Sequence, residues 1–385
     1  MSSASPVPEP AARPAPGWYP DPWQVAPFRW WDGHVWTGHA SVATARAGPA
    51  RPPRLPSWAS VPVLVAAGLV APVLAVLAVA EPASAALAFV PLVFVVPVLV
   101  WADRLEPEPR NARVHAFLWG ATISILVAGT VNGVVLTAIG ESVAVVGSAP
   151  FIEEIMKGLA VVIAVRRREV DGPVDGIVYA GWVAAGFAVV ENIEYFLAAS
   201  DDGVLAETFV LRAVVTPFSH PLFTAWTGLA IGRAVAAGRP LRSAWWGLAV
   251  AMALHAAWNG SLVAAGGRED LTLLAVAASA FVGIFTLTAA VLLLVRRSER
   301  RDYLAAVPFL TATYRLPPGE VAVFGSWREL VAARRRLPKP ARGAFDDLHA
   351  ALARLAALHA RPVTTDPADE ARLLAQLDEA RQAIR

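Results

Sequence analysis

Residues 150–157 read Pro-Phe-Ile-Glu-Glu-Ile-Met-Lys, and they lie inside a run, residues 143–165, that is otherwise apolar. A lone acid or lysine at the centre of a membrane-spanning helix costs about 2.5–3.5 kcal/mol, so charges at this depth usually serve a function. Glu153 and Lys157 are four residues apart and Glu154 and Lys157 are three apart, so on a helix one lysine reaches either acid. The alternative is a neutralised ion pair that only holds helices together. Three further polar clusters in later segments favour a functional site.

The composition is that of an integral membrane protein. The chain has 385 residues, of which 56% are hydrophobic and 17% charged, and its mean hydropathy is +0.51. The net charge of +2 and the pI near 9.2 come from arginines at membrane edges, so they give no reason to expect nucleic acid as a partner. The chain has no cysteine, which excludes disulfides, thiolate metal sites and a cysteine nucleophile. Any metal must therefore be held by His, Glu, Asp or Asn.

The N-terminal part divides into three segments. Residues 1–16 are rich in Pro and Ala and predict a disordered lead. Residues 17–45 contain five tryptophans, separated by Pro-Asp-Pro and Asp-Gly turn signals, and predict a small hairpin-based aromatic module. Their pattern, GWYPDP followed by RWWDGHVWT, resembles a short Trp-rich domain of unknown function found ahead of bacterial membrane segments. Residues 46–56 form a Pro/Arg linker to the membrane part.

The central part, residues 57–297, is predicted to be an all-α polytopic domain with about eight transmembrane helices. About 20 consecutive apolar residues are needed for a helix to cross a bilayer. Eight stretches have this length: 58–80, 84–102, 113–139, 142–165, 174–199, 207–235, 243–265 and 270–295. Arginines gather at one side of these stretches, which predicts that both termini face the cytoplasm. The expected location is the bacterial cytoplasmic membrane, in contact with the lipid bilayer.

Residues 300–385 predict a helical cytoplasmic tail. The Ala/Leu/Arg periodicity from Ala341 to His359 and from Pro367 to Ile384 indicates two amphipathic helices, expected to form a hairpin. The tail contains no catalytic motif. The tail and the Trp-rich module are therefore candidates for binding cytoplasmic partners.

Four predicted membrane segments carry polar residues that packing alone does not explain. In chain order these residues are Glu153, Glu154, Lys157, Glu191, Asn192, Glu194, Tyr195, His220, Thr224, His255 and Asn259. Their depth indicates whether they can meet: Glu153 and His220 each precede a cytoplasmic-side arginine by 13 residues, and His255 follows one by 13. At about 1.5 Å per residue, each lies roughly 20 Å from that edge of a core about 30 Å thick. The sequence therefore predicts one buried site slightly beyond the midplane.

Two histidines and two or three glutamates at one depth suit the activation of water. Zinc accepts imidazole nitrogens and carboxylate oxygens, and an open site of two histidines and one glutamate makes a water molecule reactive. The candidate ligands are His220, His255 and Glu191. Without a metal, a desolvated glutamate could take the proton from water while His and Asn side chains stabilise the oxyanion. Both alternatives lead to hydrolysis of a carbonyl compound.

Taken together, these motifs resemble the PrsW family of bacterial membrane proteases, which is related to CAAX-prenyl-protease and bacteriocin-processing membrane enzymes. The resemblance covers roughly residues 90–265 and rests on the stretches 103–109, 150–157, 174–179, 186–195, 220–224 and 255–259. It implies an enzyme, a glutamic or metallo-type peptidase that cleaves a membrane-bound protein within or beside the bilayer. The best-known family role is site-1 cleavage of an anti-sigma factor.

Carried over residue by residue, the resemblance implies catalytic or supporting roles for seven side chains: Glu153, Glu154, Lys157, Glu191, His220, His255 and Asn259. Glu153 would act as base or as metal ligand, and Glu194 is an additional acid within the same motifs. Two alternatives come from other classes of protein. One is an ion- or proton-relay transporter, although the chain shows no internal repeat of the kind that transporters carry. The other is a scaffold whose Trp-rich module and tail recruit partners.

Overall fold

The computed structural model describes residues 17–20, 22–23, 28–31, 34–41, 61–266, 271–314, 323, 326–360 and 367–384. The chain divides into two compact units, Pro52–Arg301 on the one hand and Met1–Arg51 with Asp302–Arg385 on the other. The predicted lead over residues 1–16 and the predicted linker over residues 46–56 lie outside the described residues.

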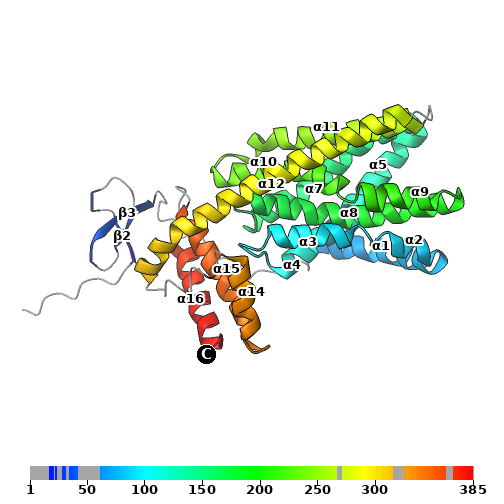
Figure 1. Ribbon diagram of the computed structural model, residues 1–385. Helices are drawn as coiled ribbons and strands as arrows, with labels where there is room; N and C mark the ends of the chain where they lie inside the picture. The colour runs from blue at the N-terminus through cyan, green and yellow to red at the C-terminus, as the bar shows by residue number, and fades with distance from the viewer. Residues whose placement is uncertain are drawn as a thin grey trace, which may run out of the picture. The chain divides into compact units, whose positions relative to one another are not determined.

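Three short antiparallel strands form in the Trp-rich segment (Figure 1): β1 (Gly17–Pro20), β2 (Phe28–Trp31) and β3 (Trp36–Ser41). The middle strand, β2, pairs with both neighbours. Trp36 is the centre of the aromatic packing, because the rings of Tyr19, Trp23 and Trp31 lie 6.2, 6.4 and 5.3 Å from its ring centroid. Edge-to-face aromatic contacts of this kind stabilise a sheet that is too small to enclose a core.

The Pro52–Arg301 unit is a bundle of helices (Figure 1). Its first helices are α1 (Val61–Ala80), α2 (Pro82–Leu87), α3 (Leu92–Ala102), α4 (Arg110–Trp119), α5 (Ile125–Ala138) and α6 (Glu141–Val143). They are followed by α7 (Ala149–Arg166), α8 (Pro173–Asp201), α9 (Leu205–Phe209), α10 (Ser219–Ala236), α11 (Trp245–Gly266) and α12 (Leu271–Tyr314). Three short π-helices, η2 (Gly120–Ser124), η3 (Ala144–Ser148) and η4 (Val210–Val215), and one 3₁₀-helix, η5 (Leu241–Ala244), lie between these α-helices.

Six helical stretches of the described residues are long and apolar enough to cross a membrane. They are Val61–Ala80, Pro82–Ala102, Arg110–Ala138, Pro173–Asp201, Leu241–Ala265 and Ala275–Ala306. Apart from the small sheet of the Trp-rich segment, the chain is therefore an all-α polytopic membrane protein, as predicted. The other two predicted spans, 142–165 and 207–235, contain the helices α7 and α10, of 18 residues each, whose polar side chains lower their hydropathy. The count of eight crossings stays a prediction.

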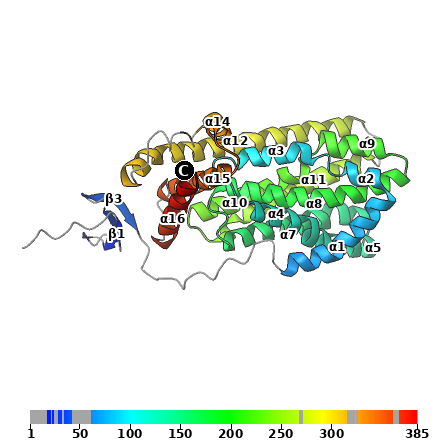
Figure 2. The same cartoon turned by 90° about the horizontal axis from the view of Figure 1, so that it is seen from below.

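The central helix of the bundle is α8. Its span is 89% buried, against 11–28% for the other five candidate spans. Figure 2 shows α8 among α4, α7 and α10, all of which pack on it. The helix begins at Pro173 because proline is favoured in a first turn, and the carboxylate of Asp175 accepts the backbone N–H groups of Asp171 and Gly172 at 3.0 and 2.7 Å.

Glycines bring α8 and α10 into backbone contact. A Cβ added to Gly176 would lie 2.1 Å from the carbonyl oxygen of Gly228, and a Cβ added to Gly228 would lie 2.1 Å from that of Gly176. One turn further along α10, a Cβ on Gly232 would lie 2.2 Å from the carbonyl oxygen of Gly172. Small residues commonly mediate packing in membranes, because lipid provides no hydrophobic drive for helices to associate. The close approach fixes the two helices that carry Glu191 and His220.

The predicted span 207–235 is not one continuous helix. The turn η4 ends at Val215 and α10 begins at Ser219, with Pro217 in the gap. Proline has no backbone N–H and clashes with the preceding turn, so it interrupts helices. The hydroxyl of Thr216 donates to the carbonyl oxygen of Leu211 at 2.8 Å and satisfies one carbonyl at the break. His220 consequently lies in the first turn of a new helix.

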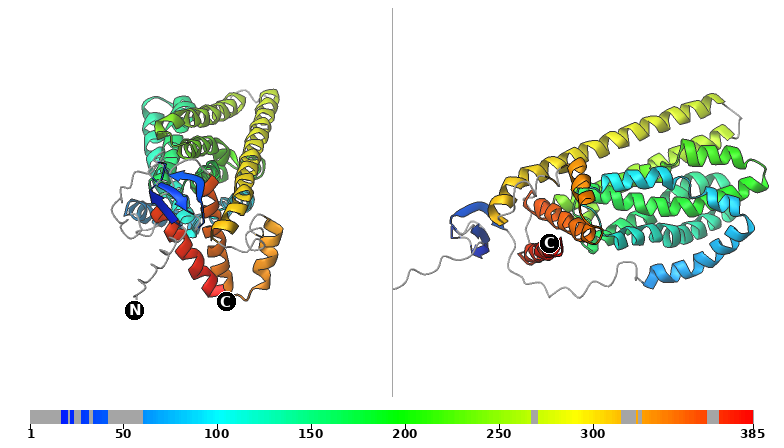
Figure 3. Two further views of the ribbon diagram at one scale, coloured as in Figure 1. Left: turned by 90° about the vertical axis from the view of Figure 1, so that its left-hand side faces the viewer. Right: turned by 60° about the horizontal axis from the view of Figure 1, so that its bottom comes forward.

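The last membrane helix, α12, continues to Tyr314, well beyond residue 295 where the predicted span ends. Figure 3 shows its first half beside the other helices of the bundle. There, Leu292 and Val295 pack against the cluster of Ile177 and Leu229. Nothing interrupts the helix after residue 295, because the arginines that follow are good helix formers.

The C-terminal tail is helical, as predicted. The helices α15 (Ala341–Ala360) and α16 (Pro367–Ile384) coincide with the two predicted amphipathic helices, and they pack against each other. A further helix, α14 (Trp327–Arg336), was not predicted. It is joined to α15 by Arg334, whose guanidinium donates to both carboxylate oxygens of Asp346 at 2.7 and 2.9 Å.

Candidate active site

The polar residues of α7 form a closed group inside the bundle. Glu153 is 4% exposed, and Glu154 and Lys157 are fully buried. The helical spacing puts both acids beside the lysine, whose Nζ donates to Glu153 Oε2 and to Glu154 Oε1 at 3.1 Å each. These contacts are compatible with both predictions for this stretch, a structural ion pair that holds helices together and a functional site.

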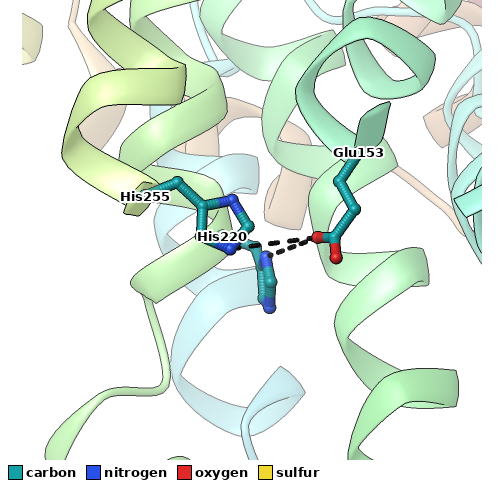
Figure 4. A group of neighbouring side chains, drawn as sticks. All are labelled: Glu153, His220 and His255. Carbon is teal, nitrogen blue, oxygen red and sulfur yellow. Dashed lines mark ion pairs between the residues drawn. The ribbon is translucent and has the colours of Figure 1, made fainter. Parts of the chain in front are cut away.

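Two histidines from other helices face the same carboxylate. His220 comes from the first turn of α10 and His255 from the middle of α11, and Figure 4 shows both rings directed at Glu153. Glu153 Oε2 lies 4.0 Å from His220 Nδ1 and 3.9 Å from His255 Nε2. The two rings are edge to face, with centroids 5.3 Å apart. Glu153, His220 and His255, which the depth argument predicts to lie at one level in the membrane, are therefore neighbours in the structure.

Each histidine uses its other nitrogen to bind a second carboxylate. His220 Nε2 lies 2.8 Å from Glu191 Oε2, and His255 Nδ1 lies 3.2 Å from Glu154 Oε1. Because carboxylates only accept, the hydrogen-bond network assigns the proton of each ring to this outer nitrogen. The inner nitrogens, which face Glu153, then present lone pairs. Carboxylates commonly orient metal-ligating histidines in this way.

An arginine that was not predicted completes the group. Arg212, on η4, donates through Nη2 to the same oxygen of Glu191 that binds His220, and through Nε to Asn192 Oδ1 at 2.7 Å. Its guanidinium also lies 3.8 Å from the ring centroid of Tyr195. The sequence does hold a signal: Arg212 is a charged residue within the predicted span 207–235, at the end opposite the other arginines.

Aromatic rings and a threonine close the sides of the group. Lys157 Nζ lies 4.0 Å from the ring centroid of Phe187, and the ring of Phe223 stacks on His255 with centroids 5.2 Å apart. The hydroxyl of Thr224 donates to Glu154 Oε2 at 2.8 Å. Glu154 therefore accepts hydrogen bonds at both oxygens, which makes it a fixed anchor rather than a group directed at substrate.

Two polar residues of the predicted motifs lie outside this group. The amide of Asn259 donates to the carbonyl oxygen of Val145 at 2.9 Å, and so ties α11 to η3. Glu194 is exposed at the surface of α8. Asn259 is four residues after His255 on the same face of α11, but its side chain does not reach the two histidines.

The geometry identifies a group of three residues that could hold a metal ion. Glu153, His220 and His255 each offer one ligand atom, and these atoms lie within 4.8 Å of one another. Glu191, which the sequence suggested as the carboxylate ligand, is not in this group, because its carboxylate binds the outer nitrogen of His220 and Arg212 instead. The ligand set that fits the structure has Glu153 in its place. Two imidazoles with lone pairs directed inward and one carboxylate are donors suited to zinc.

The acidic stretch 103–109 lies at the end of the bundle where α8 begins. The carboxylate of Asp103 accepts hydrogen bonds from Arg113 Nη1 at 3.2 Å and from the backbone N–H of Glu108 at 3.1 Å. Glu108 in turn accepts the hydroxyl of Tyr179 at 2.9 Å. Burial raises the pKa of Asp103 to about 7, although Arg113 acts in the opposite direction. These contacts hold the stretch against α4 and α8.

Fold and site together define the class of protein: an all-α, multi-pass membrane protein with a buried centre of carboxylates and imidazoles. Residues 108–309, more than half of the chain, match the PrsW family of intramembrane metalloproteases. The chain belongs to this family. Residues 16–53 match a family of proteins of unknown function, DUF2510, in agreement with the resemblance of the Trp-rich segment.

Two relatives carry the name Protease PrsW. The protein from Geobacillus kaustophilus is 36% identical over 138 residues, which are 34% of this chain and 58% of the relative. The protein from Clostridioides difficile is 27% identical over 154 residues, which are 37% of this chain and 64% of the relative. The chain thus spans less than two thirds of the length of these relatives. No solved structure matches the chain.

Proposed function

We propose that the chain is a membrane peptidase that hydrolyses a peptide bond of a membrane-bound protein with water activated at Glu153. The observation that carries the proposal is one buried carboxylate facing two imidazoles from different helices, with Glu153 Oε2 4.0 Å from His220 Nδ1 and 3.9 Å from His255 Nε2. Helix packing alone does not require such a group, and each polar member is costly in a bilayer.

In this proposal the side chains divide the work. Glu153 takes the proton of the attacking water or acts as a ligand, and the inner nitrogens of His220 and His255 would bind the metal. In the alternative without a metal, an imidazole must first take up a proton on its inner nitrogen, and it then donates to the oxyanion that forms on the scissile carbonyl. Glu154 and Glu191 hold the two histidines by their outer nitrogens, and Lys157 offsets the charge of the acids. The electrostatic groups are fixed in place before the reaction, which is how such sites lower a barrier.

The family's description as metalloproteases agrees with a metal centre at the same place. Glu153, His220 and His255 would hold the ion, and zinc is the metal that best suits their donor atoms. When bound, zinc would polarise the scissile carbonyl and make a water molecule acidic enough to react. Glu191, Glu154 and Arg212 would keep the two imidazoles oriented toward it.

The proposed substrate is a membrane-bound protein, for which an anti-sigma factor is the specific candidate, because that is the best-known role of the family. The arginines at one side of the spans favour insertion in the bacterial cytoplasmic membrane with both termini in the cytoplasm. The Trp-rich module and the helical tail would then be available to cytoplasmic partners.

An ion or proton relay is the second candidate, because hydrogen bonds connect Arg212, Glu191, His220, Lys157 and Glu153 without interruption. A relay must carry charge from one side of the membrane to the other. In the described residues this network instead ends inside the bundle, because Lys157 also donates to Glu154, whose second oxygen accepts from the buried hydroxyl of Thr224. This arrangement favours hydrolysis at one place over transport.

The test compares cells that produce the wild type or Glu153→Gln at equal levels, and maps new N-termini of membrane proteins by mass spectrometry. We expect cleavage products with the wild type and a loss of about 10²–10⁴-fold in their rate of formation with Glu153→Gln. Glu194→Gln is the matched control, because the same change falls on an exposed acid. Identical cleavage products with wild type and Glu153→Gln would overturn the proposal.

A further inference from the structure

Lys157 is held as a cation at the centre of the site. Its Nζ lies 3.1 Å from Glu153 Oε2, 3.1 Å from Glu154 Oε1 and 3.0 Å from His220 Nδ1. An ammonium has three N–H donors, and these three acceptors use all of them. The side chain is fully buried, and its charge rests over the ring of Phe187.

The choice of lysine is specific to this position. Of the 33 basic residues in the chain, only Lys157 and Lys339 are lysines, and all the others are arginines. A guanidinium is a planar fork suited to bidentate contacts, whereas an ammonium is a compact point charge. The three acceptors, on Glu153, Glu154 and His220, converge on one point and therefore suit the compact charge of a lysine ammonium. A small metal ion is also a compact positive charge, so the same acceptors would suit it.

Distances show that the ammonium and a metal ion compete for the same space. Glu153 Oε2 and His220 Nδ1 are 4.0 Å apart, so an ion at a zinc–ligand distance of about 2.0–2.2 Å from both must lie near their midpoint. Lys157 Nζ lies 3.1 and 3.0 Å from the same two atoms. The ion would then be within about 3 Å of Nζ. Two cations that close, in a buried site, repel each other strongly.

We propose that Lys157 fills the metal position in the metal-free protein, and that metal loading requires its ammonium to withdraw from Glu153 and His220. When Lys157 withdraws, it keeps its hydrogen bond to Glu154. The carboxylate of Glu154 stays in place because it also accepts hydrogen bonds from Thr224 and His255. The inference rests on the proposed function, since it takes Glu153, His220 and His255 as the metal's ligands. It makes Lys157 a positioning residue that sets the metal affinity of the site.

The test is a cobalt(II) titration of the detergent-purified full chain, followed by the visible absorption of the bound ion. Lys157→Met removes the competing charge, so we expect cobalt to bind at least about tenfold more tightly than in the wild type. Lys157→Arg keeps the positive charge, but the larger planar guanidinium withdraws less easily from Glu153 and His220. We therefore expect this variant to bind cobalt more weakly than the wild type. Lys339→Met is the matched control on the exposed tail, and should leave the affinity unchanged.

Equal or weaker binding by Lys157→Met overturns the inference, and weaker binding would instead make the amine of Lys157 a metal ligand. Lys157→Met leaves two buried acids without a counter-ion, so it could fail to fold. In that case Lys157→Met/Glu154→Gln should bind cobalt more tightly than Glu154→Gln, and equal affinities would contradict the inference. Absence of cobalt binding in all variants also overturns it. The peptidase proposal is judged separately, by the cleavage products lost in Glu153→Gln.

Discussion

The carboxylate of Glu191 and the imidazole of His220 are joined by a hydrogen bond of 2.8 Å, and this bond decides which nitrogen of His220 faces the centre of the site. Glu191 Oε2 also accepts a hydrogen bond from Arg212, whose charge keeps the carboxylate in its accepting form. The proton of His220 is thereby held on Nε2, and the lone pair of Nδ1 is directed at Glu153 and Lys157. Glu191 on α8 thus orients the imidazole of His220 on α10, so that Nδ1 faces the centre of the site.

Glu191→Gln should weaken the site without unfolding the protein. The amide keeps one acceptor oxygen but loses the charge that fixes the imidazole, and loss of such a partner typically costs 10–100-fold in activity or metal affinity, about the range we expect here. The measurement is the rate of substrate cleavage beside cobalt affinity. Glu194→Gln, three residues along the same helix but exposed, should change neither. A Glu191→Gln enzyme with full activity would show that the tautomer of His220 is fixed by other groups.

Replacing Arg212 should affect both stability and activity. Arg212→Met removes charged hydrogen bonds to Glu191 and Asn192, and we expect unfolding in detergent to become easier by about 1–3 kcal/mol, with a slower cleavage rate. Arg212→Lys retains the charge, so it should recover part of the rate. If both variants lose stability but cleave at the wild-type rate, Arg212 only joins η4 to α8.

Gly228→Ala should separate α8 from α10. The new methyl group would lie 2.1 Å from the carbonyl oxygen of Gly176, so the helices must move apart, at a cost of about 1–3 kcal/mol. Activity should fall as well, because the same two helices carry Glu191 and His220. Gly133→Ala is the control in another membrane helix, where nothing lies within 4 Å of the added atom, and it should be neutral or slightly stabilising. Thermal unfolding in detergent, measured for both variants, distinguishes packing from a general intolerance of alanine.

The sequence was sufficient to predict the central polar group, because polar side chains in a bilayer must satisfy one another. Glu153, His220 and His255 were each placed at the same depth by counting residues from flanking arginines, and the structure brings them within reach of a single ion. Depth depends only on helix rise, which is nearly constant. The tail helices were predicted for a similar reason, since their amphipathic periodicity is strong.

The sequence was not sufficient to pair these residues. α8 is apolar on nearly all sides and buried on nearly all sides, so its periodicity does not show which face meets which neighbour. Glu191 was therefore suggested as a metal ligand, whereas it binds the outer side of His220. Arg212 is not among the predicted site residues, although an arginine at that end of an apolar span is unusual. The break before α10 follows from Pro217, which the apolar pattern conceals.

The stability of the protein should depend on pH through Asp103. Its pKa in the folded protein is raised to about 7 by burial, above the ordinary value of 3.8, so the folded state holds the proton more tightly than the unfolded state does. The stability that this carboxyl contributes is therefore present at low pH and is lost as pH rises from about 4 to about 7. In Asp103→Asn this dependence should be absent. The measurement is the free energy of unfolding of both proteins from pH 5 to pH 8, and parallel curves would contradict the assignment.

Removal of the two inner histidines should abolish metal binding. In the wild type, His220 and His255 present lone pairs toward Glu153, so elemental mass spectrometry of purified protein should find about one zinc ion per chain. The double variant His220→Ala/His255→Ala should lose it. His115→Ala is the control, because His115 is also buried in the bundle but does not belong to the group of Glu153, His220 and His255. Zinc retained by the double variant would place the metal elsewhere. A wild type that is folded and active without metal would leave Glu153 to activate water alone, and the imidazoles would stabilise the oxyanion only after taking up a proton on their inner nitrogens.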